Sequence, residues 1–265
     1  SNPVVLSYNF DKWGLQPTSQ ITGDSASAEL PISWEDTRAA EIGGPDAVGG
    51  THSIASFNVL NYFTTISGRT GPDGSQSPRG ANNDTEFARQ EAKIVAAINA
   101  LDADVVGLTE IENDPRGTVS LSALVSALNA AGGTWAFVDT GAIEGAQGGA
   151  LEGDAIKNGF IYNYETVELD GNFALLDETV DARFQSEGVQ RPSIAQTFTE
   201  KASGESFTAV INHLKSKGSA VNGDVDQGDG QSASANVRNA AAEALADWIA
   251  NDPTGTGEDD VILLG

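Results

Sequence analysis

The 265-residue sequence has no cysteine and no methionine. Without cysteine there is no disulfide framework, no zinc–thiolate site and no cysteine nucleophile. Because methionine is missing even at position one, we expect the sequence to be a processed or excised piece of a longer product. No apolar run approaches the ~18 residues of a membrane-spanning helix, and no signal peptide starts at Ser1. We therefore expect no insertion into a membrane.

Basic residues are also scarce. The chain has 14 Lys and Arg against 38 Asp and Glu, which gives a formal net charge of −24 and a pI near 4.1. Such a balance excludes a broad basic face that could bind a nucleic-acid backbone. Any polyanion must therefore bind at a small, locally basic site. Acidity without cysteine favours a secreted or cell-surface protein.

What the sequence does have is enough apolar material for a core, since 39% of its residues are hydrophobic. Residues 1–50 show little periodicity and predict an irregular leader or an edge hairpin. Residues 51–265 show no internal repeat and no sharp change of composition, so they predict one domain.

Strands and helices alternate along that domain. Apolar runs predict strands, and apolar residues at helical spacing predict helices, the first with Asp84 as its N-cap. The later strands follow one another closely and predict antiparallel pairing. The pattern predicts an α/β domain of mixed strands with helices on its outer faces. The predicted strands are 54–60, 104–110, 134–138, 159–163, 193–199, 206–212 and 261–264, and the helices are 85–101, 120–133 and 234–251.

Polar side chains end three of these apolar runs. Asn58 lies near the end of one, Glu110 ends the next, and Asn212 and His213 end a third. Loops that leave strand ends build the ligand crevice of α/β sheets, so these groups are candidates to converge. The alternative is that strands simply end where polarity begins. Glu110 closes the run VVGL, and a lone carboxylate backed by amides and substrate phosphates would suit Mg²⁺.

Two more acidic residues, Glu112 and Asp114, follow Glu110 in the segment IENDP. A solvated acidic turn is the simpler interpretation for both of them.

His213 is one of two histidines and is followed by Lys215 and Lys217. In so acidic a chain this cluster predicts a positive spot that could hold phosphate or protonate a leaving oxygen. The alternative is a capping or core-edge histidine. His52 has no basic residues next to it in the sequence, and it is expected to be structural or on the surface.

Two further segments carry acidic residues that could have a function. In GDAIKNGFIY, Asp154 could orient a histidine, although a loop-capping aspartate followed by a surface Lys157 is the simpler interpretation. In NGDVDQGDGQ, Asp224, Asp226 and Asp229 have a spacing similar to that of calcium loops. The EF-hand pattern fails, because Gly228 and Ala235 occupy its fifth and twelfth positions. A looser calcium site and a solvated loop both stay open.

In their order and spacing, several of these motifs resemble one family from about residue 53 to Gly265: the secreted bacterial nucleases of the endonuclease/exonuclease/phosphatase superfamily. The segments are SFNVLNYF, VVGLTEIEN, GDAIKNGFIY, VQRPSIAQTF, VINHLKSKGS, GDGQ and VILLG. The resemblance implies the deoxyribonuclease I-like fold, a four-layer α/β/β/α sandwich. It also implies cleavage of phosphodiesters with Mg²⁺, with Mn²⁺ as an alternative and Ca²⁺ as a structural ion.

The resemblance also suggests roles for individual residues. Asn58 matches the family's asparagine beside metal and phosphate, Glu110 its metal-binding glutamate, and His213 its histidine that acts as general acid or phosphate contact. Asp154 matches more loosely the acid that orients this histidine. The candidates for binding the substrate near the phosphate are Lys157, Arg191, Asn212 and Lys215.

One departure from the family concerns the C-terminal end. There, VILLG runs into an Asp-x-Asn motif and later a Ser-Asp-His motif, and this sequence ends at Gly265 before both. We therefore expect a C-terminally truncated domain that lacks half of the family's constellation.

The expected function is that of an extracellular nuclease that cleaves DNA, or also RNA, by in-line attack of water. One alternative is a phosphatase or phosphodiesterase of the same superfamily that acts on lipid or inositol phosphates. The other is a non-catalytic acidic surface or adhesion module.

Overall fold

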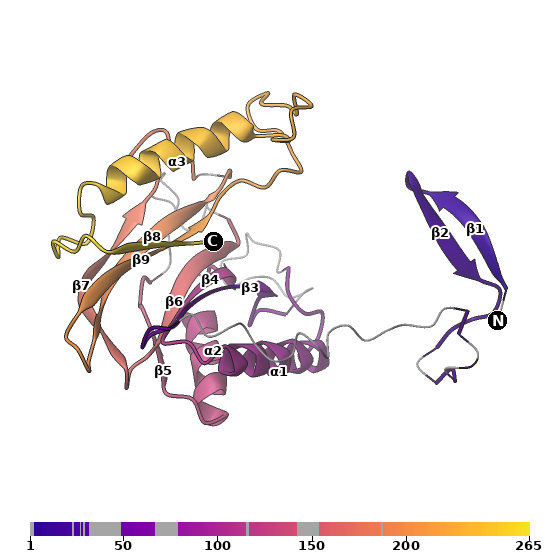
Figure 1. Ribbon diagram of the computed structural model, residues 1–265, viewed down its shortest axis with the longest axis horizontal. Coiled ribbons are helices and arrows are strands. Elements are labelled where there is room, and N and C mark those ends of the chain that lie inside the picture. The colour runs from indigo at the N-terminus through magenta and orange to yellow at the C-terminus, as the bar shows by residue number, and fades with distance from the viewer. Residues whose placement is uncertain are drawn as a thin grey trace. The chain divides into compact units, whose positions relative to one another are not determined.

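A computed structural model describes residues 3–22, 24–26, 28, 30–31, 49–66, 79–114, 117–141, 154–186 and 188–265. The chain divides into two units, Ser1–Gly49 and Gly50–Gly265 (Figure 1). In the first unit, β1 (Val4–Asn9) and β2 (Lys12–Pro17) pair as an antiparallel hairpin. Residues 32–48 of the predicted leader lie outside the described residues.

The described residues of the second unit form two four-stranded sheets. The first has the order β3 (Ile54–Tyr62), β4 (Val105–Glu112), β6 (Ile156–Asn163) and β5 (Trp135–Phe137). β3 and β4 are parallel, whereas β6 is antiparallel to both β4 and β5. β4 and β6 are buried along most of their length, which explains the apolar runs VVGL and GFIY in the sequence. The strand predicted over residues 159–163 begins earlier, at Ile156, because Lys157 and Asn158 are buried as well.

The second sheet has the order β10 (Val261–Leu264), β9 (Ser206–His213), β8 (Arg191–Glu200) and β7 (Val167–Leu176). The predicted antiparallel pairing of β8 and β9 is confirmed, whereas β6, which was predicted in the same series, lies in the first sheet. β10 is parallel to β9. β7 escaped prediction because it is an edge strand with mostly exposed residues over its first half.

In the described part of the second unit, three helices accompany the sheets: α1 (Asp84–Leu101), α2 (Val119–Ala130) and α3 (Ala235–Ile249). The predicted N-cap of α1 is wrong by one residue. Asn83 is the cap, and its side-chain oxygen accepts a hydrogen bond from the Glu86 backbone N–H at 2.9 Å. Among the described residues, no helix has both the length and the apolar character needed to cross a membrane.

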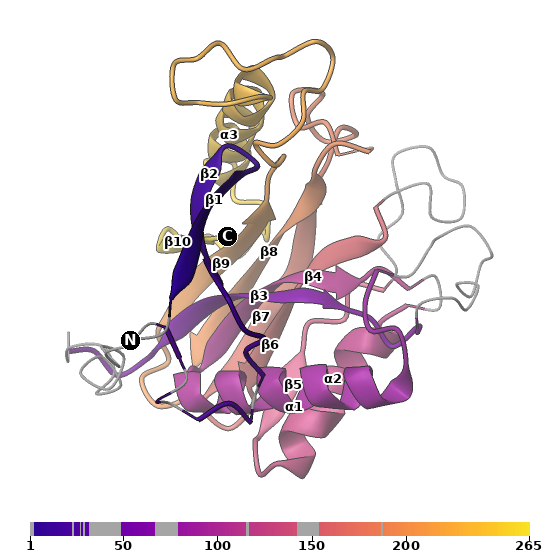
Figure 2. The same cartoon turned by 90° about the vertical axis from the view of Figure 1, so that its right-hand side faces the viewer.

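Three hydrophobic clusters order these elements into four layers, because side chains alternate between the two faces of each strand. On β4, Val106 packs toward α1 and α2, whereas Val105 packs between the sheets. On β9, Ile211 packs between the sheets, whereas Val210 packs toward α3. The order is therefore α/β/β/α, as predicted, and Figures 1 and 2 show α1 and α2 on one side of the sheets and α3 on the other.

The two sheets approach each other closely at Gly107 of β4. A Cβ atom there would lie 2.8 Å from Leu264 Cδ1 and 3.0 Å from Ile211 Cδ1, both on the second sheet. The absent side chain lets β4 and β9 approach each other, so residues near the C-terminal ends of both strands can meet across the sandwich.

Candidate functional site

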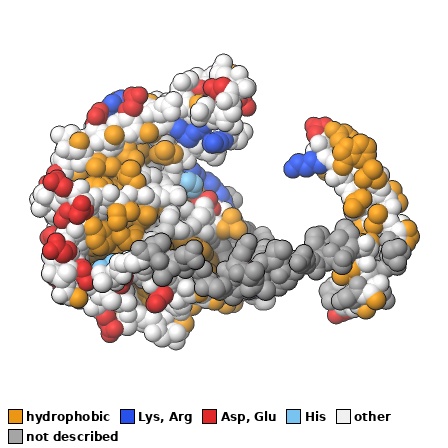
Figure 3. All heavy atoms as spheres, viewed as in Figure 1, with side chains coloured by type: hydrophobic (Ala, Val, Ile, Leu, Met, Phe, Trp, Pro, Cys, Tyr) orange, Lys and Arg blue, Asp and Glu red, His pale blue; other side chains and the backbone are white. Residues whose placement is uncertain are grey.

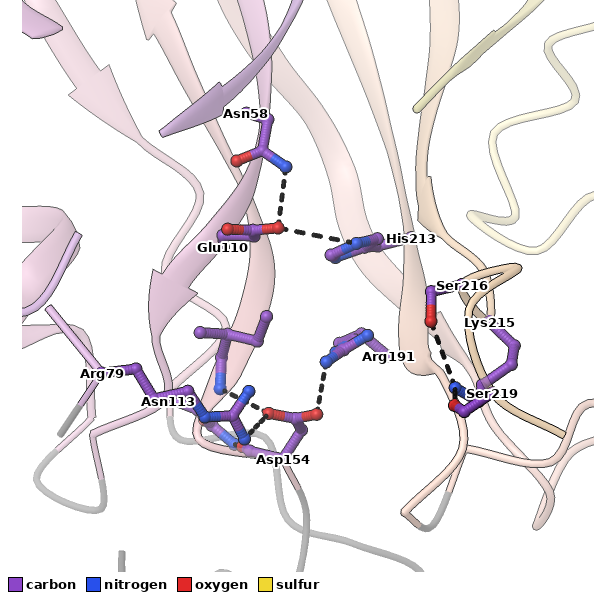
Figure 4. A network of polar contacts seen from close by, with 11 residues as sticks. Asn58, Arg79, Glu110, Asn113, Asp154, Arg191, His213, Lys215, Ser216 and Ser219 are labelled. Atoms are coloured by element: carbon purple, nitrogen blue, oxygen red, sulfur yellow. Dashed lines mark hydrogen bonds and ion pairs between the residues drawn. The ribbon is translucent and has the colours of Figure 1, made fainter. Parts of the chain in front are cut away.

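Three predicted residues meet where β3, β4 and β9 end (Figure 4). The Asn58 side-chain Nδ2 donates a hydrogen bond of 2.9 Å to Glu110 Oε1. His213 Nε2 lies 3.9 Å from that same oxygen. The side chains of Glu110 and His213 are 17% and 24% exposed, so a ligand could reach both. The structure thus brings together an amide, a carboxylate and an imidazole from distant parts of the sequence.

The backbone at Glu110 has a left-handed conformation, with φ at 68°. Pairing between β3 and β4 jumps from Asn58↔Thr109 to Tyr62↔Ile111, so three residues of β3 lie opposite Glu110 alone. Bulges and positive φ at residues other than glycine are costly and cluster at functional sites. Here the bulge turns the Asn61 backbone N–H to Glu110 Oε2 at 3.2 Å.

Asn58 orients Glu110 in this arrangement. Its Nδ2 faces the carboxylate, and its Oδ1 accepts a hydrogen bond from the Leu60 backbone N–H at 2.7 Å. The predicted role of Asn58 as a metal ligand through its oxygen stays a prediction.

A second cluster lies beside the first and centres on Asp154. Arg191 and Arg79 both form ion pairs with this carboxylate, the latter at 2.7 Å. Arg191 is opposite His213 in the β8–β9 register, which places the arginine next to the histidine. The Asp154 contacts go to these two guanidinium groups and to the Ile156 backbone N–H. The expectation that Asp154 directly orients His213 is therefore not met, because the arginines take its oxygens.

Burial lowers the pKa of His213 below its usual value, and the neighbouring Arg191 charge lowers it further. Glu110 and Asp154 oppose this shift. Its buried Nδ1 has no hydrogen-bond partner among the described residues. At neutral pH the imidazole is therefore mainly neutral, which suits a hydrogen bond to phosphate better than immediate donation of a proton.

Two of the residues predicted to bind substrate, Lys215 and Asn212, differ in exposure. Lys215 is partly exposed, and its Nζ donates to Ser219 Oγ at 2.8 Å. Asn212 is buried, accepts a hydrogen bond from Ser193 Oγ of β8 and donates one to the Leu264 carbonyl of β10. Its side chain thus connects neighbouring strands and does not face a bound phosphate.

Lys157 is not the surface lysine that the simpler interpretation expected. It is only 1% exposed, and its Nζ donates to the Gly141 carbonyl. Burial lowers the pKa of Lys157 to about 8, although Asp139 and Asp114 oppose the shift. Its neighbours hold the ammonium inside the fold, so the structure does not present it to a substrate.

The acidic segment after Glu110 is not a solvated turn. Glu112 is 5% exposed and Asp114 is 1% exposed, so that interpretation of the two residues is wrong. Glu112 accepts hydrogen bonds from the Thr64 and Thr65 backbone N–H groups and from Ser120 Oγ. It therefore joins the loop after β3 to the start of α2.

The Asp224–Asp229 loop has structural contacts. Asp224 accepts from Asn236 Nδ2 and from the Val237 backbone N–H, at the start of α3. Asp226 and Asp229 each accept from the backbone N–H two residues later, as in an Asx turn. Over the described part of the chain, no three His, Asp or Glu side chains group as a metal site. The predicted calcium loop therefore has no support in these contacts.

The donors at the strand ends fit one kind of metal site. Glu110 supplies a partly exposed carboxylate, and the nearby polar groups are amides. Mg²⁺ is commonly bound in proteins by one or two carboxylates, while waters and substrate phosphates complete its shell. Among the described residues of this cluster, Glu110 alone offers a carboxylate to an ion, since Asn58 and Asn61 direct N–H groups at it. A magnesium ion there would need water and substrate oxygens for the rest of its shell.

Sequence reasoning missed two residues at the site. Arg79 follows a Gly- and Ser-rich segment without periodicity, and Gln90 lies on α1, where glutamine is an ordinary surface residue. Gln90 Nε2 donates to the Leu60 carbonyl within the bulge at 2.9 Å. Neither residue ends an apolar run, so the signal that found Glu110 could not find them.

Comparison with known proteins finds similarity in solved structures alone, since no family model and no curated protein matches. The chain is similar to endonuclease/exonuclease/phosphatase proteins. One is that of Bacteroides vulgatus, with 16% identity over 76% of this chain and 60% of the other, at a TM-score of 0.44.

The names of two other similar structures mention a substrate or a bound product. Mannosyl-6-phosphatase Bt3783 of Bacteroides thetaiotaomicron has 16% identity over 80% of this chain and 64% of its own, at a TM-score of 0.45. TDP2 of D. rerio in complex with a single-strand DNA product has 15% identity over 80% and 58%, at 0.42. The present chain spans less than two thirds of each of these three proteins.

Proposed function

We propose that this chain is a metal-dependent phosphoester hydrolase, and specifically a secreted nuclease that cleaves phosphodiesters of DNA or RNA. The observation that carries the proposal is the convergence of Asn58, Glu110 and His213 from three strands, with Arg191 alongside. The chain as a whole is acidic, but Arg191 places a positive charge next to His213. This gives an anionic ester a local site where it can bind.

Each residue of this cluster would have a separate role in binding the metal or the phosphate. Glu110 would hold Mg²⁺, with its carboxylate plane fixed by Asn58 and the Asn61 N–H. When bound, the ion would neutralise charge that builds up on a phosphate oxygen. Arg191 is opposite His213 in the β8–β9 register, so it would contact a remaining phosphate oxygen. Lys215 would contact another only if its Nζ left Ser219.

Hydrolysis joins a water oxygen to phosphorus and breaks the bond to one ester oxygen, which leaves with a proton. His213 would hydrogen-bond the phosphate or that leaving oxygen. Because its pKa lies below its usual value, it would donate a proton only after an approaching phosphate has raised that pKa.

The test is nicking of supercoiled plasmid by the 265-residue chain and by a longer form that continues past Gly265, each with Mg²⁺ and with EDTA, and by the Glu110→Ala and His213→Ala variants of whichever form nicks. We expect EDTA to abolish nicking and each substitution to slow it by about 100-fold or more. Glu168→Ala is the matched control, because Glu168 is an exposed acid on the edge strand β7. Undiminished nicking in EDTA or by Glu110→Ala would remove Glu110 and its metal from the mechanism.

A further inference from the structure

Gln90 of α1 contacts three successive backbone carbonyls of β3. Its Nε2 lies 2.9 Å from the Leu60 oxygen and 3.4 Å from the oxygens of Val59 and Asn61. Gln90 lines a cleft of about 520 Å³ between α1 and β3, on which Asn58 also lies. A primary amide has two N–H donors on its nitrogen. Both N–H groups of Gln90 therefore face carbonyl oxygens of β3.

The backbone that Gln90 contacts is strained. Leu60 and Asn61 both have positive φ angles, 53° and 55°. A left-handed conformation is costly for a residue such as Leu60, whereas asparagine tolerates it better. The Leu60 side chain is 73% exposed, so its burial does not compensate for that cost. Such a conformation persists only where surrounding contacts impose it, and Gln90 supplies contacts from outside the strand.

The backbone conformation of Leu60 and Asn61 determines the direction of their own N–H groups. The Leu60 N–H bonds to Asn58 Oδ1, and the Asn61 N–H bonds to Glu110 Oε2. The other oxygen, Oε1, accepts from Asn58 Nδ2. Each oxygen of Glu110 therefore has one donor, and both donors depend on the conformation of the bulge.

We propose that Gln90 is a positioning residue: by holding the carbonyls of the bulge, its amide fixes the plane of the Glu110 carboxylate for a divalent cation. This inference rests on the proposed function, because it assigns the cation to Glu110. Partners of metal ligands restrict the orientation of those ligands, and their loss typically costs 10- to 100-fold in metal affinity.

A merely structural glutamine would behave differently. It would change the midpoint of thermal unfolding, Tm, without changing the affinity of the folded protein for the ion. Measuring both quantities on the same 265-residue chain therefore separates the two roles.

The experiment titrates Mn²⁺ by calorimetry, well below the Tm, into the wild type and its variants. We expect Gln90→Met, which keeps the length but has no N–H, to weaken binding by about tenfold. Gln90→Lys keeps N–H donors and is expected to stay within about threefold of the wild type. Lys93→Met is the matched control, because Lys93 lines the same cleft on the same helix, and we expect its affinity to be unchanged.

An unchanged Mn²⁺ affinity in Gln90→Met, whatever its Tm, would overturn the inference. Glu110→Ala distinguishes this failure from that of the proposed function. If Glu110→Ala loses Mn²⁺ and Gln90→Met does not, only the role of Gln90 fails; if Glu110→Ala binds as tightly as the wild type, the metal site fails. Should Gln90→Met not fold, Gln90→Glu replaces it, and equal affinity in Gln90→Glu and Gln90→Lys would count against the role.

Discussion

Glu110 and Glu112 lie two residues apart on β4 and have opposite surroundings. Glu110 is partly exposed beside His213, whereas Glu112 is buried among donors from the loop after β3 and the start of α2. The irregular pairing of β4 with β6 between Leu108 and Ile111 interrupts the regular alternation of faces. One carboxylate is therefore available to a ligand, and the other holds the loops around it.

We expect Glu112→Ala to destabilise the fold, because the backbone N–H groups of Thr64 and Thr65 would lose their acceptor. Losing charge-assisted hydrogen bonds in a buried position costs about 3 kcal/mol, which lowers the Tm of a domain of this size by about 6–12 °C. Thermal unfolding followed by circular dichroism measures this. The exposed Glu168→Ala should stay within about 0.5 kcal/mol, and an equal Tm in both variants would show that Glu112 does not hold the loops.

At the scale of elements, His52 links the two sheets. It precedes β3, and its Nδ1 lies 3.2 Å from Asp104, which precedes β4. Its Nε2 lies 2.5 Å from Glu200, the last residue of β8 in the other sheet. Glu200 raises the pKa of His52 above its usual value, Asp104 adds to the shift, and burial partly offsets it.

This raised pKa predicts how stability depends on pH. The ion pairs contribute fully between about pH 5, above which carboxyl groups are ordinarily ionised, and about pH 6.5, the unfolded pKa of histidine. Their contribution is lost as pH rises through the higher pKa of the folded protein. Denaturant unfolding of the wild type and His52→Gln should therefore show a difference of about 1 kcal/mol between about pH 5 and pH 6.5 that fades as pH rises further. A difference that is constant, or that grows with pH, would exclude this role.

The sequence predicts an element best where one physical cause dominates. β4 and the GFIY segment of β6 are buried on both faces and stand out as apolar runs, whereas β7 pairs along one edge and its sequence resembles a polar loop. Asn58, Glu110 and His213 were predicted because each lies at or near the end of an apolar run. Gln90 and Arg79 could not be found, because their partners depend on a bulge in β3 and on a carboxylate 75 residues away.

At the scale of the whole molecule, the net charge of −24 opposes an anionic substrate. Figure 3 shows acidic side chains around the rim of the second unit, and a histidine next to basic side chains on the same face. Approach of a nucleic acid should therefore be limited by long-range repulsion, and attraction should act only near the site.

We expect added salt to speed cleavage of DNA by this protein at constant Mg²⁺. The Debye length falls from about 30 Å at 0.01 M to about 8 Å near 0.15 M salt, which screens the repulsion. The initial rate on plasmid should rise by about two- to tenfold over that range. A small phosphodiester with one negative charge is the control and should respond less. A rate on DNA that falls over the same range would indicate a basic binding surface and contradict this account.

The most direct test of the central claim is the position of a bound ion. Crystals of the protein soaked in Mn²⁺ would show it as an anomalous scattering peak. The account predicts a peak about 2 Å from a Glu110 carboxylate oxygen, on the side that faces His213. A peak confined to the Asp224–Asp229 loop, or no peak at Glu110 in fully soaked crystals, would contradict it.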